Sequence, residues 1–391
     1  MIMDKDQPRK LPLIALLALT VTGFTAIITE TLPAGLLPQI SEGLGISRAY
    51  TGQFITAYAL GSVLAAIPII SLTRNWNRKP LLLMAVGGFV VFNLATFLLH
   101  SYALLLTVRF LAGVSAGIIW GLLTGYTVRM VAPEMAGKAL AIVGVGQPLA
   151  LSLGVPMATW LGKLVGWNTI FLMIAVLSVI LLVWIVALVP DFSITKKTTS
   201  VPFKLVFSNG AIKRILAMTL CWILGHNLLY TYVAPYLKAS SMAEHIDWML
   251  FLFGISSILG IWLTGYLIDT YLRKLIVVNL ILFIVAGLLM WLGITHHALV
   301  YVGVALWGYA FGGAPTLMQK DLADVAGEHI DIAQAIFVTA FNSAIAGGGF
   351  LGGILLEYFG VPYVIVALIF MALVTLTIGL SKRTPASSPA S

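Results

Sequence analysis

The chain has 391 residues, of which 60% are hydrophobic and only 9% are charged. A soluble globular domain carries about 45–50% apolar and about 25% charged residues, so this composition excludes a water-soluble fold. The net charge of +8 does not indicate a nucleic-acid partner, because the Lys and Arg residues lie between long apolar runs rather than on one polar face or tail.

Twelve apolar runs follow one another along the chain, and a helix that crosses a bilayer needs about 20 such residues. They cover residues 11–37, 51–72, 80–99, 103–131, 139–161, 169–189, 212–237, 248–268, 275–294, 299–318, 333–356 and 361–380. Each run should be helical, because an unpaired backbone group in hydrocarbon costs several kcal/mol. The sequence therefore predicts an all-α membrane protein with twelve transmembrane helices.

The basic residues predict the orientation of these helices. If the N-terminus is cytoplasmic, the loops on the outer side hold only Arg48, Lys163 and Lys238 of the 22 Lys and Arg residues. Cytoplasmic loops of membrane proteins carry an excess of Lys and Arg. We therefore expect both termini to lie in the cytoplasm.

The second half of the sequence repeats features of the first half. The matching pairs, 195 to 197 residues apart, are Arg78 and Arg273, Gly113 and Gly308, Gly117 and Gly312, and Pro38 and Pro235. Parallel six-helix halves around a midplane binding site are a transporter architecture. The repeat predicts two pseudo-symmetric six-helix bundles, residues 1–190 and 212–391, joined by a cytoplasmic linker at 191–211.

Two motifs resemble those of the major facilitator superfamily. Residues 108–117 resemble the pattern R-F-x-x-G-x-x-x-G, and residues 265–274 resemble G-x-L-x-D-R-x-G-R-K with Thr270 and Leu272 as departures. In the first half of the chain, the 195-residue offset places Arg74 at the position equivalent to Asp269, so this earlier copy of the motif has no Asp. The resemblance implies a conformational lock made by Asp269, Arg273 and Arg78, with most of its charge on the later copy.

Residues 30–38 and 154–156 are similar to the twelve-span drug:proton antiporters, in particular the sugar, nucleoside and chloramphenicol efflux branch. This resemblance implies a monomer in the bacterial inner membrane that exports a small organic molecule in exchange for protons by alternating access. A proton-coupled importer and a non-transporting membrane sensor remain as alternatives.

Three ionisable residues within the apolar runs are the candidates for proton coupling. Glu30 lies some twenty residues into the first run, where an acid usually faces a cavity and is functional. His226 lies midway along the seventh run, and an offset of 197 places Glu30 on the neighbouring Asn227. Arg109 is the residue to which the family motif assigns proton coupling. We predict that Glu30 is the principal proton carrier and that His226 faces the same central cavity.

Each of these residues also has a purely structural interpretation. Glu30 could be a solvated residue at the outer end of its helix, His226 could bond to a neighbouring helix, and Arg109 could extend its charge to the membrane interface.

Aromatic and polar residues predict the substrate site, because the first, fourth, seventh and tenth helices line the cavity in this family. An apolar pocket with a few polar groups suits a small, weakly polar molecule, although Trp and Tyr near helix ends are also typical of membrane interfaces. The predicted substrate-binding residues are Trp120, Gln147, Trp222, His226, Asn227, Tyr230, Trp307, Tyr309 and Phe311.

No enzyme motif is present in the sequence. It has no Gly-rich phosphate loop followed by Lys and Ser or Thr, and His100, His296 and His297 have no metal-ligating neighbours. We expect no catalytic activity, cofactor, metal or nucleic-acid partner.

Overall fold

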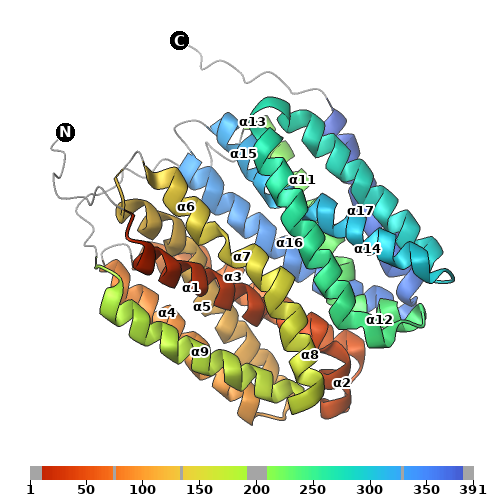
Figure 1. Cartoon of the computed structure of the whole chain (residues 1–391), viewed down its shortest axis with the longest axis horizontal. Helices are drawn as coiled ribbons and strands as arrows, with labels where there is room; N and C mark the ends of the chain where they lie inside the picture. The colour runs from red at the N-terminus through yellow and green to blue at the C-terminus, as the bar shows by residue number, and fades with distance from the viewer. Residues whose placement is uncertain (1–10, 74–75, 133–134, 192–208, 327–329, 382–391) are drawn as a thin grey trace. The chain divides into compact units, whose positions relative to one another are not determined.

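The computed structural model describes residues 11–73, 76–132, 135–191, 209–326 and 330–381. All regular secondary structure in these ranges is helical, which confirms the predicted fold class (Figure 1). In the first half the helices are α1 (Leu13–Gly35), α2 (Leu37–Leu44), α3 (Arg48–Leu72), α4 (Arg78–Leu98), α5 (Tyr102–Arg129), α6 (Ala136–Gly144), α7 (Gly146–Leu149), α8 (Val155–Val165) and α9 (Trp167–Leu188). In the second half they are α11 (Gly210–Thr231), α12 (Val233–Ala239), α13 (Ile246–Gly293), α14 (His297–Gly312), α15 (Ala314–Ala326), α16 (Ile330–Tyr358) and α17 (Val361–Leu380).

The helices accommodate the twelve predicted crossings. Among the described residues, 10 helical segments are long and apolar enough to cross a membrane. The segment that contains α13 counts twice, because 48 helical residues would span about 72 Å and the helix bends at Tyr271, whose backbone is not helical. Helix α3, with 25 residues, is long enough for the remaining crossing.

The exposed faces of the helices are covered with large apolar side chains. On α9, for example, Met173, Val176, Ile180 and Val183 are all exposed. A soluble protein rarely exposes apolar patches of this extent, so lipid is the solvent of these faces.

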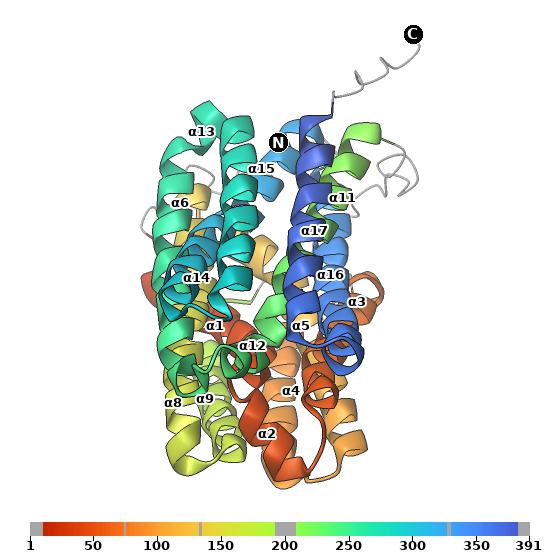
Figure 2. The same ribbon diagram turned by 90° about the vertical axis from the view of Figure 1, so that its right-hand side faces the viewer.

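The chain forms two compact units. The first contains residues 1–46 and 57–196, and the second contains residues 47–56 and 197–391. Within the first unit α4 lies beside α9 and α5 (Figure 1), and within the second unit α11 lies beside α16 and α17 (Figure 2). The predicted linker at 191–211 lies mostly outside the described residues.

Equivalent glycines hold equivalent helices together in the two units. In the first unit a Cβ atom at Gly113 of α5 would overlap the backbone carbonyl of Tyr58 of α3. In the second unit a Cβ atom at Gly308 of α14 would overlap the carbonyl of Phe253 of α13. Both members of the second pair lie 195 residues after those of the first, so the repeat seen in the sequence is also a repeat of helix packing.

The first helix of each half breaks at an equivalent place. After α1, the backbone departs from helical geometry at Leu36, with φ −97° and ψ 9°. After α11, it does so at Tyr232, with φ −113° and ψ 27°. Glu30 and His226 each lie six residues before the break. The two predicted site residues therefore occupy matching positions in the two units.

The fifth predicted run is not one regular helix. It is divided into α6, α7, a π-helical segment over Ala150–Gly154, and α8. Pro148 precedes this segment and Pro156 follows it, and proline removes a backbone donor and crowds the preceding turn. Single-turn π-helical segments are frequent at functional sites.

Candidate functional site

Arg109 lies at the centre of a buried polar cluster in the first unit. Its side chain is 0% exposed, and its Nη2 donates a hydrogen bond to the backbone carbonyl of Thr29 on α1. The guanidinium also lies 5.0 Å from the ring centre of Tyr58 and 5.6 Å from that of Phe171. The side chain thus points inward rather than to the membrane interface.

Glu30 is buried in the same cluster, with 4% of its surface exposed. This burial does not fit a solvated residue at the end of the helix. Arg109 Nη2 approaches the backbone carbonyl of Glu30 at 3.5 Å. Among the described residues, the Oε1 atom of Glu30 and the Nε and Nη1 atoms of Arg109 have no hydrogen-bond partner. A buried acceptor and buried donors are therefore available to bind a proton or a water molecule.

Tyr58 is held beside Arg109 by close packing of α3 on α5. Gly113 is one helical turn after Arg109, and the backbone of Tyr58 lies against it. The Tyr58 hydroxyl donates a 2.9 Å hydrogen bond to the carbonyl of Ala26 on α1. The glycine therefore allows the aromatic ring to pack over the guanidinium, where a cation–π contact is favourable.

His226 forms the second cluster, in the second unit. Its ring is 5% exposed, and Nε1 of Trp307 donates a 3.1 Å hydrogen bond to its Nδ1. Since Nδ1 accepts this bond, the neutral ring carries its hydrogen on Nε2, which remains a possible donor. The bond to Trp307 of α14 agrees with the structural interpretation of His226, a bond to a neighbouring helix.

Aromatic rings surround His226. Phe311 stacks on it with ring centres 3.4 Å apart and planes at 3°, and Tyr230 lies at 5.2 Å. Phe253 of α13 lies at 5.7 Å. The sequence interpretation missed Phe253, although the 195-residue repeat matches it to Tyr58, the ring beside Arg109. The two clusters are thus built from equivalent parts of the two units.

The other predicted substrate-binding residues lie outside this ring cluster. Trp222 is fully buried one turn before His226, and its Nε1 has no partner among the described residues. The Nδ2 atom of Asn227 donates a 2.9 Å hydrogen bond to the backbone carbonyl of Ile223 in the same helix. The remaining three are half-buried: Tyr309 on α14 in the second unit, and Trp120 and Gln147 in the first unit.

The residues of the predicted lock lie near the helix ends and bends that the sequence predicts to be cytoplasmic. Asp269 and Arg273 are exposed on either side of the bend in α13. The charge of Asp269 acts on Lys320 of α15, which also forms an ion pair with Asp324. The structure therefore brings Asp269 near a basic residue of a neighbouring helix of its own unit.

A carboxylate that the sequence interpretation missed lies near Arg78 in the first unit. Asp191, just after α9, accepts hydrogen bonds from the side chain of Asn77 and from the backbone N–H of Lys79, each at 3.1 Å. Arg78 itself is half-buried, and its Nη1 has no partner among the described residues. The first copy of the loop motif lacks its own Asp, but Asp191, which follows α9, lies beside it.

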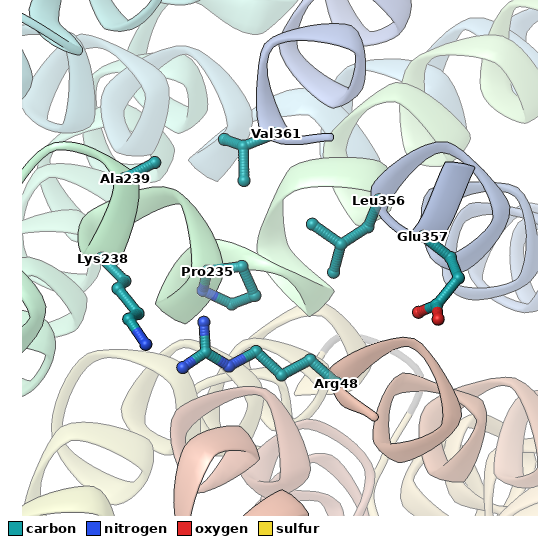
Figure 3. Close-up of a pocket in the computed structure, with 7 residues that line it drawn as sticks. All are labelled: Arg48, Pro235, Lys238, Ala239, Leu356, Glu357 and Val361. Carbon is teal, nitrogen blue, oxygen red and sulfur yellow. The ribbon is translucent and has the colours of Figure 1, made fainter. Parts of the chain in front are cut away.

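A cavity of about 520 Å³ lies in the second unit, and its lining includes no residue of the His226 cluster. Figure 3 shows the side chains of Arg48 and Lys238 extending toward one another across it. Pro235, also in its lining, lies on α12, nine residues after His226 and beyond the break at Tyr232. None of the predicted site residues lines this cavity.

Comparison with known proteins gives the family. The family model described as the Major Facilitator Superfamily matches residues 19–243 and 238–391. A "Probable sugar efflux transporter" of Helicobacter pylori is 25% identical over 366 residues, covering 93% of this chain and 94% of the relative. The "Uncharacterized MFS-type transporter YbcL" of Bacillus subtilis is 28% identical over 348 residues, covering 87% and 88%.

Solved structures show the same fold. A mutant of the nucleoside transporter NupG superposes with a TM-score of 0.71 at 14% identity, over 93% of this chain and 98% of that one. A bacterial homologue of the human lysosomal transporter Spinster gives a TM-score of 0.66 at 14% identity, over 95% and 96%. These helices, their repeat and the family match together make this multi-pass membrane protein a member of the major facilitator superfamily, a family of secondary transporters of small molecules and not of enzymes.

Proposed function

We propose that this chain is a proton-coupled efflux antiporter that exports a small organic molecule, a sugar in the first instance, across the bacterial inner membrane. The observation that carries the proposal is the buried Glu30 carboxyl beside Arg109, without an ion pair between the two side chains among the described residues. The similarity to probable sugar efflux transporters over almost the whole chain supports a sugar as substrate.

Proton coupling follows from the charge of this cluster. When Glu30 is ionised, its charge balances that of Arg109, and both remain buried at moderate cost. When Glu30 takes up a proton from the outer side, Arg109 becomes the uncompensated charge. A change of conformation that releases the substrate then accompanies protonation, and loss of the proton to the cytoplasm restores the binding form.

The His226 cluster suits the substrate. A sugar presents hydroxyl oxygens that accept hydrogen bonds and a carbon face that packs on aromatic rings. The Nε2–H of His226 would supply a donor, and Tyr230, Trp307 and Phe311 would supply the apolar surface. We further propose that both chain ends are cytoplasmic and that the protein acts as a monomer.

Inside-out membrane vesicles test this function. Respiration acidifies their interior, and a pH-sensitive dye reports the gradient while glucose, lactose, uridine or chloramphenicol is added outside. An exported substrate enters the vesicle in exchange for protons, so the interior becomes less acidic. We expect this signal for the wild type with at least one compound and not for E30Q. A proton-coupled importer would give no such signal, and a sensor would move neither protons nor solute.

A further inference from the structure

Thr29 differs from the other threonines of α1. The hydroxyl groups of Thr20, Thr22, Thr25 and Thr31 each donate to the backbone carbonyl four residues earlier, at 2.7 to 3.0 Å. Within the described residues, Thr29 makes no such bond, although it is fully buried. Its Oγ1 instead accepts a hydrogen bond from Asn93 of α4 at 3.4 Å. The Thr29 side chain is therefore hydrogen-bonded to another helix rather than to its own.

Asn93 is costly to bury. It is 0% exposed, and its Nδ2 is shared between Thr29 and the carbonyl of Phe89, the latter at 2.9 Å. Its Oδ1 has no hydrogen-bond partner among the described residues. An apolar side chain of similar shape would avoid this unpaired acceptor. Stability alone thus gives no reason for an asparagine at this position.

Thr29 links Asn93 to the proton site. Its side chain accepts from Asn93, while its backbone carbonyl accepts from Nη2 of Arg109 on α5. The next residue in the chain is Glu30. One residue of α1 therefore bonds to both α4 and α5 next to Glu30, and its carbonyl occupies Nη2 of Arg109, so that Nε and Nη1 have no partner among the described residues.

We propose that Asn93 and Thr29 are positioning residues of the proton site, which hold α1 so that the Glu30 carboxyl faces the open donors of Arg109. Without the Asn93 bond, Thr29 would return its hydroxyl to its own helix, as the other threonines of α1 do. The carbonyl that anchors Arg109 would then be free to shift. This inference rests on the proposed role of Glu30 as the proton carrier.

Infrared titration of the purified protein tests the proposal without a substrate. Ionisation of Glu30 removes the absorption band of its protonated carboxyl group, and E30Q identifies that band. We expect T29V and N93L to move the pH midpoint of the band by about 0.7 units, a fivefold change in the proton equilibrium. T29S, which keeps the hydroxyl, and T25V, which removes a hydroxyl bonded only within α1, should keep the wild-type midpoint.

Transport gives a second readout in the vesicles described above. T29V and N93L should lower proton-driven uptake about fivefold but leave downhill exchange of the same compound within about twofold, because the substrate site is in the other unit. Should N93L fail to fold, T29V carries the test, since valine fits a helix within the membrane.

Three results would decide against the proposal or its basis. Equal midpoints for T29V and T25V would overturn the positioning role while leaving the function of Glu30 intact. A shift in T29S as large as that in T29V would show that packing, not the hydroxyl, is responsible. Persistence of the titrating band and of proton-driven uptake in E30Q would instead remove the proposed function itself.

Discussion

Arg109 approaches Glu30 through the backbone carbonyl of that residue, while the Glu30 Oε1 atom has no partner in the described part of the chain. A tight ion pair would hold Glu30 in its charged form, whereas this arrangement keeps the two charges close without joining them. The carboxyl group can therefore gain and lose a proton without breaking a bond that holds Arg109 in place. Coupling between proton and substrate requires a group of this kind.

Replacement of Glu30 by glutamine should abolish uphill efflux. The amide keeps the size and polarity of the side chain but cannot change its charge, so proton binding no longer biases the conformation. Coupling free energies of about 1–3 kcal/mol correspond to about 5- to 150-fold, so proton-driven transport in vesicles should fall at least fivefold. Downhill exchange of labelled substrate should continue.

The matched control is E42Q, because Glu42 is an exposed carboxylate on α2. Its transport should equal that of the wild type. Uphill efflux by E30Q at the wild-type rate would exclude Glu30 as the proton carrier, and Arg109 with His226 would then be the better candidates.

Replacement of Trp307 by phenylalanine should weaken substrate binding. The indole N–H fixes the tautomer of His226, and without it the ring can present an acceptor instead of a donor at Nε2. One hydrogen bond is worth about 1 kcal/mol, so the Kd of the exported compound should rise about fivefold, as measured by isothermal calorimetry or by scintillation proximity.

W291F provides the comparison, since Trp291 lies on α13 of the same unit with 47% of its surface exposed. Its affinity should not change. If W307F binds substrate as tightly as W291F does, the ring cluster around His226 is structural and the substrate binds elsewhere.

The sequence predicted the helices well but only part of the candidate site. Lipid as solvent requires long apolar helices, so hydropathy alone locates them. The equivalence of Glu30 and His226 could be predicted because it depends on a repeat along the chain. Asn93 and Asp191 could not be found in this way, since their partners Thr29 and Asn77 lie 64 and 114 residues away.

Phe253 is an intermediate case. The same repeat matches it to Tyr58, so the sequence could have indicated it. A phenylalanine in an apolar run is not otherwise distinguished from its neighbours, and only its contact with His226 in the structure identifies it as part of the candidate site. The sequence also predicts that Glu30 and His226 face one cavity. The two residues belong to different units, and this stays a prediction.

Alanine at Gly113 or Gly308 should destabilise its own unit. In both cases the new Cβ would overlap a backbone carbonyl of the neighbouring helix, which cannot move aside as a side chain can. Overpacking of this kind costs about 1–3 kcal/mol. A thermal-unfolding assay on protein in detergent should show a lower Tm for both variants.

G125A is the control on the same helix as Gly113, because a Cβ at Gly125 would meet nothing within 4 Å. Its Tm should match or exceed that of the wild type, since alanine favours helix over glycine. Similar Tm values for G113A and G125A would contradict the close helix contact.

Neutralisation of Asp191 should disturb the predicted cytoplasmic end of the first unit, as we expect neutralisation of Asp269 to disturb that of the second. The sequence placed most of the locking charge on Asp269, because Arg74 stands at the matching place in the first half. In the structure, Asp191 accepts a hydrogen bond from the Lys79 backbone N–H at the start of α4, where a negative charge is favourable by about 0.3–1 kcal/mol. Each of D191N and D269N should therefore shift the balance between open and closed cytoplasmic ends by about two- to fivefold.

Pairs of spin labels at the cytoplasmic helix ends would measure this balance as distance distributions. The shifts should add in the double variant, because the two carboxylates belong to separate units and share no partner among the described residues. E357Q, at the opposite end of the helices, should leave the distributions unchanged. A shift in D269N with none in D191N would mean that Asp191 only caps α4, and that the locking charge falls mainly on the later copy of the motif, as the sequence by itself predicts.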